Sequence, residues 1–200
     1  RAEVELPAEK FALTTTTEYP WKGIVEIGID AAAPAHAVLA LRVPGWLGEQ
    51  FLPGRLYRYD SDIPGNPSVS INGTPVDDPV FEKGYLMIDR TWSSGDNITL
   101  NLPMEPRINR AAECVEENHN KVAVTRGPLV YCLEETDNPA IDDISIPGNA
   151  TFNVAYDPAL LHGVNVISEL QSGAVLVPYH AWSNRDFGKM KVWIDEAAGA

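Results

Sequence analysis

The feature that most constrains this chain is the stretch Lys121–Glu134, KVAVTRGPLVYCLE. It holds two short apolar runs, 122–124 and 129–133, separated by a segment that contains Gly127 and Pro128. Runs this short that are rich in β-branched and aromatic residues favour strands over helices. Pro128 lacks an N–H, so it suits the start of a strand or a bend. Because the second run is apolar at every position, we expect a strand that is buried on both faces inside a sandwich. Its expected role is structural and not catalytic.

Short runs of the same kind recur along the whole chain, with turn signals between them. The other predicted strands are 11–17, 24–30, 37–43, 69–71, 84–90, 96–102, 108–115, 151–156, 164–170, 174–178 and 190–194. Asn72-Gly73 is the strongest hairpin signal, and strands 84–90 and 96–102 are expected to pair around Ser93-Ser94-Gly95. Strands of this length at a spacing of about 8–12 residues indicate a sandwich or barrel.

The predicted fold class is all-β, with two antiparallel β-sandwich (jelly-roll-like) domains. A chain of 200 residues suits one large all-β domain or two small ones, and the predicted strands suffice for two. A Pro-rich boundary near residues 103–106 divides the chain into domains 1–105 and 106–188. The irregular segment 46–66 is expected to pack against another part of the chain, because it carries large side chains. These are Phe51, Leu56, Tyr57 and Tyr59.

The formal net charge of −13 excludes two classes of partner. Nucleic acids bind basic surfaces that neutralise phosphates, and an anionic membrane repels an acidic chain in the same way. No apolar run reaches 18 residues, so we expect no transmembrane helix and a soluble chain. Whether a parent protein is periplasmic or secreted stays open. The chain opens at Arg1 without an initiator Met or a signal peptide, so we expect a segment of a longer protein.

The chain has two cysteines, Cys114 and Cys132. Two are too few for a disulfide-stapled scaffold of this size, and they are not spaced as a zinc knuckle. Both lie in apolar, strand-like runs, which favours two buried free thiols. A disulfide between them stays open, because it requires only that their strands are neighbours.

No cofactor is expected in this segment. The four histidines are dispersed and form no metal-binding pair; they are His36, His119, His162 and His180. Asp60-Ser61-Asp62 and Asp142-Asp143 could donate oxygens to calcium, but neither has the spacing of an EF-hand loop. Solvated acidic loops are the favoured interpretation, and calcium stays an unsupported alternative.

No catalytic residue is predicted either. Glycoside hydrolysis uses pairs of carboxylates, but with 28 acidic residues in the chain their presence discriminates nothing. Glu134-Glu135 follows the buried run, yet adjacent strand residues point to opposite faces and cannot cooperate as a dyad. The sequence has no Gly-x-Ser-x-Gly elbow and no phosphate-cradling glycine loop.

The segment 178–185, PYHAWSNR, holds the densest mixture of aromatic residues and hydrogen-bond donors. Tyr179 and Trp182 could stack on a sugar ring while Asn184 and Arg185 bind its hydroxyls. The alternative is a packed loop, in which Trp182 is an anchor and Arg185 pairs with a carboxylate of a neighbouring loop or domain. The packed loop is favoured, because aromatic residues in loops are more often anchors than ligand platforms.

A succession of motifs then indicates a family. In chain order these are YPWKG (19–23), LRVPGW (41–46), SINGTPV (70–76), KGYLMIDRTWSSGD (83–96), LPMEPR (102–107), RGPLVYCLE (126–134), VPYHAWSNR (177–185) and MKVWI (190–194). Any one of them is weak, but eight in register resemble the C-terminal part of glycoside hydrolase family 127, the β-L-arabinofuranosidase-like family. The resemblance covers nearly the whole chain.

The resemblance implies that catalysis lies elsewhere. In this family an N-terminal (α/α)6 barrel carries a cysteine nucleophile and a zinc ion held by cysteines and a glutamate. Neither Cys114 nor Cys132 matches that cluster, so no catalytic residue is carried over and zinc is expected only in the missing domain. The resemblance also implies that the final strand, 189–195, can return to the first sandwich.

We therefore expect a non-catalytic accessory module of a glycoside hydrolase. Its expected partners are the parent protein's own barrel and, as open alternatives, a second copy of itself or a carbohydrate. The alternative function is an autonomous carbohydrate-binding module that uses Tyr179, Trp182, Asn184 and Arg185. An enzyme complete in itself is a third hypothesis and the weakest, because no site is visible.

Overall fold

The computed structural model describes residues 2–5, 10–49, 54–60 and 65–197. Within these ranges the chain is all-β, with nineteen strands, no α-helix and three single-turn 3-10 helices, η1 (Gly45–Leu47), η2 (Glu116–Asn118) and η3 (Tyr179–Ala181). The strands form sheets that are antiparallel apart from one short parallel pair, and the chain divides into two compact units. The predicted all-β, sandwich-like fold is confirmed.

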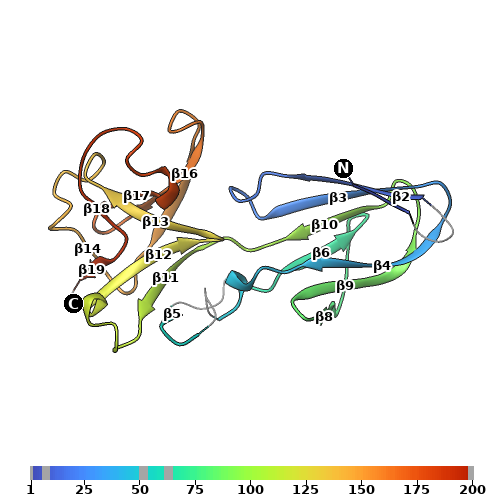
Figure 1. The fold of residues 1–200 in the computed structure, drawn as a ribbon, viewed down its shortest axis with the longest axis horizontal. Helices are drawn as coiled ribbons and strands as arrows, with labels where there is room; N and C mark the ends of the chain where they lie inside the picture. Colours follow the sequence, from blue (N-terminus) through green and yellow to red (C-terminus); the bar gives the residue numbers. More distant parts are fainter. Residues whose placement is uncertain (1, 6–9, 50–53, 61–64, 198–200) are drawn as a thin grey trace. The chain divides into compact units, whose positions relative to one another are not determined.

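The first unit spans residues 1–48 and 64–104 and consists of two sheets (Figure 1). The six-stranded sheet has the order β1 (Ala2–Glu5), β2 (Lys10–Thr17), β3 (Ile24–Ala31), β10 (Asn97–Asn101), β6 (Ser68–Ile71) and β7 (Thr74–Pro75). The three-stranded sheet has the order β4 (Ala35–Arg42), β9 (Tyr85–Trp92) and β8 (Val80–Glu82).

The core of this unit is built from side chains of both sheets. Ile29 and Ile98 of the six-stranded sheet share one buried hydrophobic cluster with Leu86 and Trp92 of the three-stranded sheet. The Trp92 side chain is fully buried, and its Nε1–H donates a hydrogen bond to the carbonyl oxygen of Ala37 at 3.0 Å. That bond satisfies the one polar atom of the indole, so its burial carries no desolvation penalty.

One of the two predicted hairpins of this unit is confirmed and the other is wrong. Asn72 and Gly73 have φ angles of 52° and 79° and connect the paired strands β6 and β7. In contrast, β9 pairs with β4 and β8, whereas β10 pairs with β3 and β6. The turn between β9 and β10, in which Asp96 Oδ2 accepts the N–H of Ser93 at 2.9 Å, carries the chain from one sheet to the other. A short turn does not decide whether two strands share a sheet, because sandwiches also use such connections between layers.

The second unit spans residues 49–63 and 105–200 and is built on one ten-stranded sheet. Its main path has the order β14 (Ser145–Ile146), β19 (Ile194–Glu196), β12 (Lys121–Arg126), β13 (Leu129–Glu134), β17 (Val175–Pro178), β16 (Val164–Glu169) and β15 (Phe152–Asp157). Three strands lie off this path: β11 (Pro106–Ala111) pairs with β12 and with β5 (Tyr57–Tyr59), and β18 (Met190–Lys191) pairs with β13.

The hairpin of β12 and β13 lies in the middle of this sheet (Figure 1). Its turn contains Gly127 with φ 56°, and Arg126 lies opposite Leu129 in the register. The four consecutive residues Tyr131–Glu134 are all buried, which confirms that both faces of this strand are covered. The hydrophobic core around the hairpin comprises Ile108, Val122, Val124, Tyr131, Leu133, Ile141, Ile146, Ile167, Ala174, Leu176 and Ile194.

The last two strands belong to the second unit. Strand β18 pairs with β13, and β19 pairs with β12 and, in parallel, with β14. The hypothesis that the final strand returns to the first sandwich is therefore wrong. The reason is burial: Ile194 is fully buried in the core of the second unit, so its strand is fixed there. The division between the units after the first sandwich lies between Met104 and Glu105.

The irregular segment 46–66 contributes a strand to the second unit, as its large side chains indicated. Strand β5 pairs with β11, and the Tyr57 ring stacks on Trp193 with a centroid distance of 5.8 Å. The guanidinium carbon of Arg107 lies 3.2 Å from the centroid of the Tyr59 ring. Leu56, in contrast, is exposed, and Phe51 lies outside the described residues.

Gly23 provides a test of the packing of the first unit. A Cβ atom at this position would overlap the carbonyl oxygen of Leu102 and approach Met104 Cγ to 3.1 Å. We expect Gly23→Ala to lower the free energy of unfolding by roughly 2–3 kcal/mol, because backbone must move to relieve the overlap. Gly45→Ala is the matched control, since a Cβ there meets nothing within 4 Å. Urea unfolding followed by tryptophan fluorescence measures both; equal midpoints would contradict the expectation.

Candidate functional site

The predicted site residues lie on the loop that follows β17. Pro178 ends the strand, and η3 folds back so that the N–H of Trp182 donates to the carbonyl oxygen of Tyr179 at 3.3 Å. Ser183 follows with a φ of 59°, and its N–H donates to Glu134 Oε1 at 2.7 Å. The loop is therefore attached to the end of β13 through a buried carboxylate.

Arg185 is held at the same place by two carboxylates. Its Nη1 donates to Asp137 Oδ1 at 2.8 Å, and its Nη2 donates to Asp137 Oδ2 at 2.5 Å and also to Glu134 Oε2. The hydrogen bonds that Arg185 donates to Asp137 raise its pKa, and the one that it donates to Glu134 raises it further. The Glu134 side chain is only 5% exposed, so its charge requires this guanidinium and the Ser183 N–H.

The turn after β13 places the second carboxylate. The carbonyl oxygen of Glu134 accepts hydrogen bonds from the backbone N–H of Asp137 at 3.1 Å and from the N–H and Nδ2 of Asn138. The Asn138 amide also exchanges two hydrogen bonds of 2.9 Å with the backbone of Val175 in β17. This fixed turn directs Asp137 toward Arg185, so the loop and the two strands form one connected assembly.

The four predicted ligand-binding residues differ in whether their side chains remain available to bind a ligand. Arg185 is engaged by Glu134 and Asp137, and Asn184 Nδ2 donates to the carbonyl oxygens of Ala181 and Trp182 at 3.0 and 3.2 Å. Tyr179 and Trp182 as whole residues are 46% and 36% exposed. Sugar binding by these four residues stays a prediction, and the geometry favours the alternative in which Arg185 pairs with carboxylates.

Two residues of this region were missed from the sequence. Asp137 is not among the residues that the sequence singles out, although it binds Arg185 from 48 positions away. Phe187, two residues after the predicted segment, is 98% exposed. No local pattern marks either residue: pairing across such a separation depends on the fold, and a single aromatic residue in a loop indicates burial as a rule.

The two cysteines have different environments. Both are free, and Cys132 is fully buried as predicted. Cys114 is exposed, so the prediction of burial is wrong for this residue; β11 ends at Ala111, before the cysteine. Burial, together with the nearby negative charge of Glu134, raises the pKa of the Cys132 thiol to about 12. Cys132 is therefore a neutral packing residue at physiological pH.

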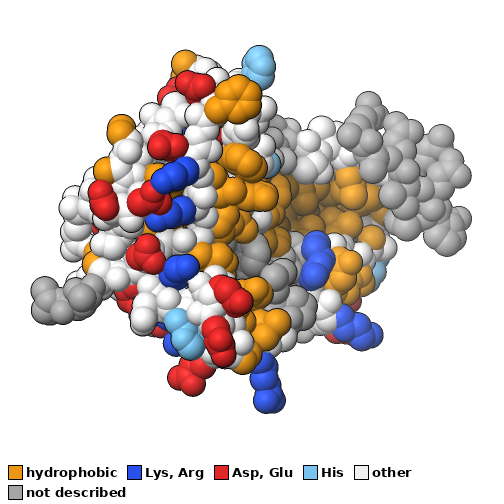
Figure 2. All heavy atoms as spheres, turned by 60° about the vertical axis from the view of Figure 1, so that its left-hand side comes forward, with side chains coloured by type: hydrophobic (Ala, Val, Ile, Leu, Met, Phe, Trp, Pro, Cys, Tyr) orange, Lys and Arg blue, Asp and Glu red, His pale blue; other side chains and the backbone are white. Residues whose placement is uncertain are grey.

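In each acidic segment considered for calcium, one carboxylate is paired with cations of the protein. Asp142 binds Lys189 and also lies 3.3 Å from Lys191 Nζ. Asp60 lies 3.2 Å from Arg58 and 2.5 Å from Arg110, while its neighbours 61 and 62 lie outside the described residues. Among the described residues, no group of three or more histidines, cysteines or carboxylates is arranged to hold a metal ion. Figure 2 accordingly shows acidic and basic side chains next to one another on one face.

In the part of the chain that the structure describes, no helix is long and apolar enough to cross a membrane.

Comparison with protein families identifies both halves of the chain. Residues 1–104 match the family described as "Beta-L-arabinofuranosidase, GH127 middle domain". Residues 106–195 match the "Glycoside hydrolase family 127 C-terminal domain". The two matches meet at the division between the compact units, next to Met104.

Individual relatives extend this similarity. The non-reducing end β-L-arabinofuranosidase of Bifidobacterium longum subsp. longum is 30% identical over 224 aligned residues, which cover 92% of this chain and 31% of the relative. A solved GH127 β-arabinofuranosidase superposes with a TM-score of 0.87 at 33% identity, covering 98% of this chain and 33% of that one. The GH127 β-L-arabinofuranosidase Ara127N-Se of Geobacillus stearothermophilus T6 gives 0.83 at 32% identity, covering 98% and 32%. The chain thus spans about a third of the length of these relatives.

The ion cluster around Arg185 can be tested by removing its cation. We expect Arg185→Met to lower the free energy of unfolding by about 3 kcal/mol, because Glu134 keeps a buried carboxylate without its counter-ion. Lys189→Met is the matched control: its pair with Asp142 is exposed to solvent, so the melting temperature should hardly change. Thermal and urea unfolding measure both variants, and an equal loss in the two would show that the cluster contributes no more than a surface pair.

Proposed function

Because the chain belongs to glycoside hydrolase family 127, of which it comprises the middle and C-terminal domains, we propose that it is a non-catalytic accessory module of a β-L-arabinofuranosidase-like enzyme. Its role would be to stabilise the catalytic domain and to complete the folded parent protein. The observation that carries this proposal is the match of the two compact units to the middle and C-terminal domains of the family.

The geometry of the candidate site supports a structural role for this region. Its charged groups Arg185, Glu134 and Asp137 bind one another within the second unit. A catalytic pair of carboxylates has to be able to contact a substrate. Glu134 does not meet this requirement, because its side chain is buried and accepts the N–H of Ser183 in the loop that follows β17. Glu135 instead accepts the backbone N–H of Lys189 at 2.8 Å, so the adjacent carboxylates serve two different contacts.

The proposed partners follow from the length of the relatives. About two thirds of each relative lies outside the part that this chain matches. We propose that the corresponding part of the parent protein is an (α/α)6 barrel that holds the zinc ion and carries out the hydrolysis of β-L-arabinofuranosides. A second copy of the chain is the other candidate partner for its exposed apolar side chains.

A second candidate function is carbohydrate binding by the loop after β17. The observation that favours it is the exposure of Tyr179 and Trp182, whose rings are available for stacking on a sugar. Trp182→Ala should then abolish binding of arabinose-containing oligosaccharides in calorimetry. Unchanged binding, or none by the unmodified chain, would exclude this candidate.

The accessory role is tested in the full-length parent protein. We expect Arg185→Met to lower its melting temperature while kcat/KM for an aryl β-L-arabinofuranoside stays within about twofold at a temperature where it is folded, because support and chemistry lie in different domains. Residues 1–200 alone should show no hydrolysis of the same substrate. Hydrolysis by the isolated chain, or a loss of kcat/KM without loss of stability, would contradict the proposal.

A further inference from the structure

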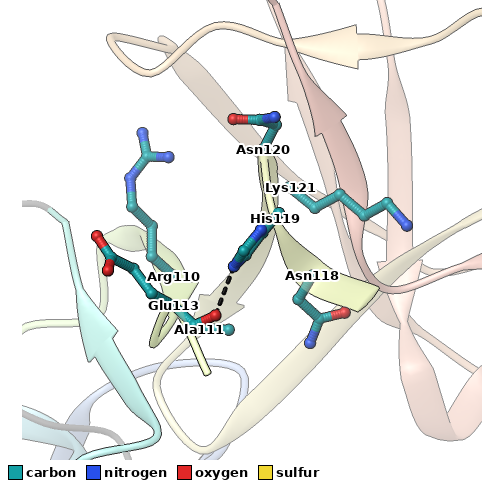
Figure 3. A pocket seen from close by; sticks show the side chains of 7 residues that line it. All are labelled: Arg110, Ala111, Glu113, Asn118, His119, Asn120 and Lys121. Carbon is teal, nitrogen blue, oxygen red and sulfur yellow. Dashed lines mark hydrogen bonds between the residues drawn. The ribbon is translucent and has the colours of Figure 1, made fainter. Parts of the chain in front are cut away.

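The connection between β11 and β12 encloses a hollow that no part of the proposed function uses. It has a volume of about 340 Å³, within the range of sites for small molecules. Its lining, shown in Figure 3, comprises Arg110, Ala111, Glu113, Asn118, His119, Asn120 and Lys121. Six of these seven side chains are polar or charged, so an apolar ligand does not fit the hollow.

The walls of the hollow are held in place before any ligand binds. His119 Nε2 lies 2.5 Å from the carbonyl oxygen of Glu113, and Lys121 Nζ donates to the carbonyl oxygen of Glu117 at 2.9 Å. Asn120 adopts a φ of 55°, and its carbonyl oxygen accepts the N–H of Glu196 at 2.8 Å. A preformed wall lowers the entropy that a ligand must overcome on binding.

Arg110 makes one end of the hollow polar without making it cationic. Its Nε donates to Asp60 Oδ2 at 2.5 Å, its Nη1 donates to Glu196 Oε2 at 2.6 Å, and its Nη2 donates to Glu196 Oε1. Three of its five N–H groups are thereby used, and two remain as donors. The two carboxylates outnumber the one guanidinium, and the chain carries a net charge of −13, so this end of the hollow does not attract an anionic ligand.

Two polar side chains of the lining have no partner in the described part of the protein. Glu113 and Asn120 are exposed to solvent, and among the described residues no hydrogen bond or ion pair engages the Glu113 carboxylate or the Asn120 side-chain amide. Figure 3 shows Glu113 and Arg110 on one side of the hollow, and His119 with Asn120 on the other. The hollow therefore presents acceptors and donors from opposite sides.

We propose that this hollow binds a neutral sugar, with Glu113 and Asn120 as the groups that recognise its hydroxyls. Each sugar hydroxyl is at once a donor and an acceptor, which matches a carboxylate facing an amide and a neutralised guanidinium. The assignment to a sugar, and not to another polyol, rests on the proposed membership in an arabinofuranoside-cleaving enzyme. Because no aromatic side chain lines the hollow, the affinity is in the millimolar range.

The test is a titration of the ¹⁵N-labelled chain with L-arabinose, followed by NMR. Binding at the hollow shifts backbone resonances of residues 110–121 and the Asn120 side-chain amide. The variant Glu113→Ala/Asn120→Gly weakens this binding by about tenfold or more, through loss of two hydrogen bonds. Glycine is used at 120 because it adopts the positive φ without strain. Asn120→Asp, which keeps the shape but replaces the amide donors, weakens binding as well.

Two control variants separate this site from others. Asn153→Ala, on the exposed side of β15, and Trp182→Ala retain the affinity and the shifts. Shifts that arise only around residues 179–182, an affinity unchanged in the double variant, or tighter binding of inorganic phosphate than of L-arabinose would each overturn the proposal. The accessory role is tested by the stability and activity of the parent protein, which are separate measurements. A negative titration would therefore reject the sugar site and leave the accessory role unaffected.

Discussion

The carboxylate of Glu134 is a charge placed at the end of the most buried strand of the second unit, and its desolvation has to be offset by nearby donors. Those donors come from a loop about fifty residues later in the chain: the Ser183 N–H and the Arg185 guanidinium. The end of β13, the following turn with Asp137 and the loop after β17 are thus fixed together. A charged residue that directly follows a hydrophobic run in the sequence is thus the point at which three segments meet.

Arg110 performs the same task elsewhere in this unit, again as one guanidinium bound by two carboxylates. It joins Asp60, 50 positions earlier, and Glu196, 86 positions later, so that β5, β11 and β19 are tied together. Hydrogen bonding to Arg110 lowers the pKa of Glu196, which keeps this carboxylate ionised and the contact intact. The strongly acidic composition therefore coexists with a well-connected fold, because the partly buried carboxylates are matched to the few available cations.

Most strands could be predicted from the sequence, because strands show local signals: alternating apolar and polar residues, β-branched residues and turn residues at their ends. The Asn72-Gly73 turn and the buried run of β13 were found in this way. Which strands become neighbours depends on contacts between distant residues, and no local pattern contains that information. This is why β9 and β10 were paired incorrectly, and why the final strand was assigned to the wrong sandwich although the burial of Ile194 fixes it in the second unit.

The same limit applies to function. Asn184 and Arg185 have the chemistry of ligand-binding residues, but the fold uses their donors for its own carbonyls and carboxylates. Glu113 and Asn120 lie in the connection between β11 and β12, where no sequence motif marks them as ligand-binding residues. Their polar groups nevertheless remain available at a preformed hollow. Residue type alone shows what a side chain can bind; only the hydrogen-bond partners show whether the protein has already used that capacity. In a module whose strongest ion pairs are structural, recognition has to rest on the polar groups that the fold leaves unmatched.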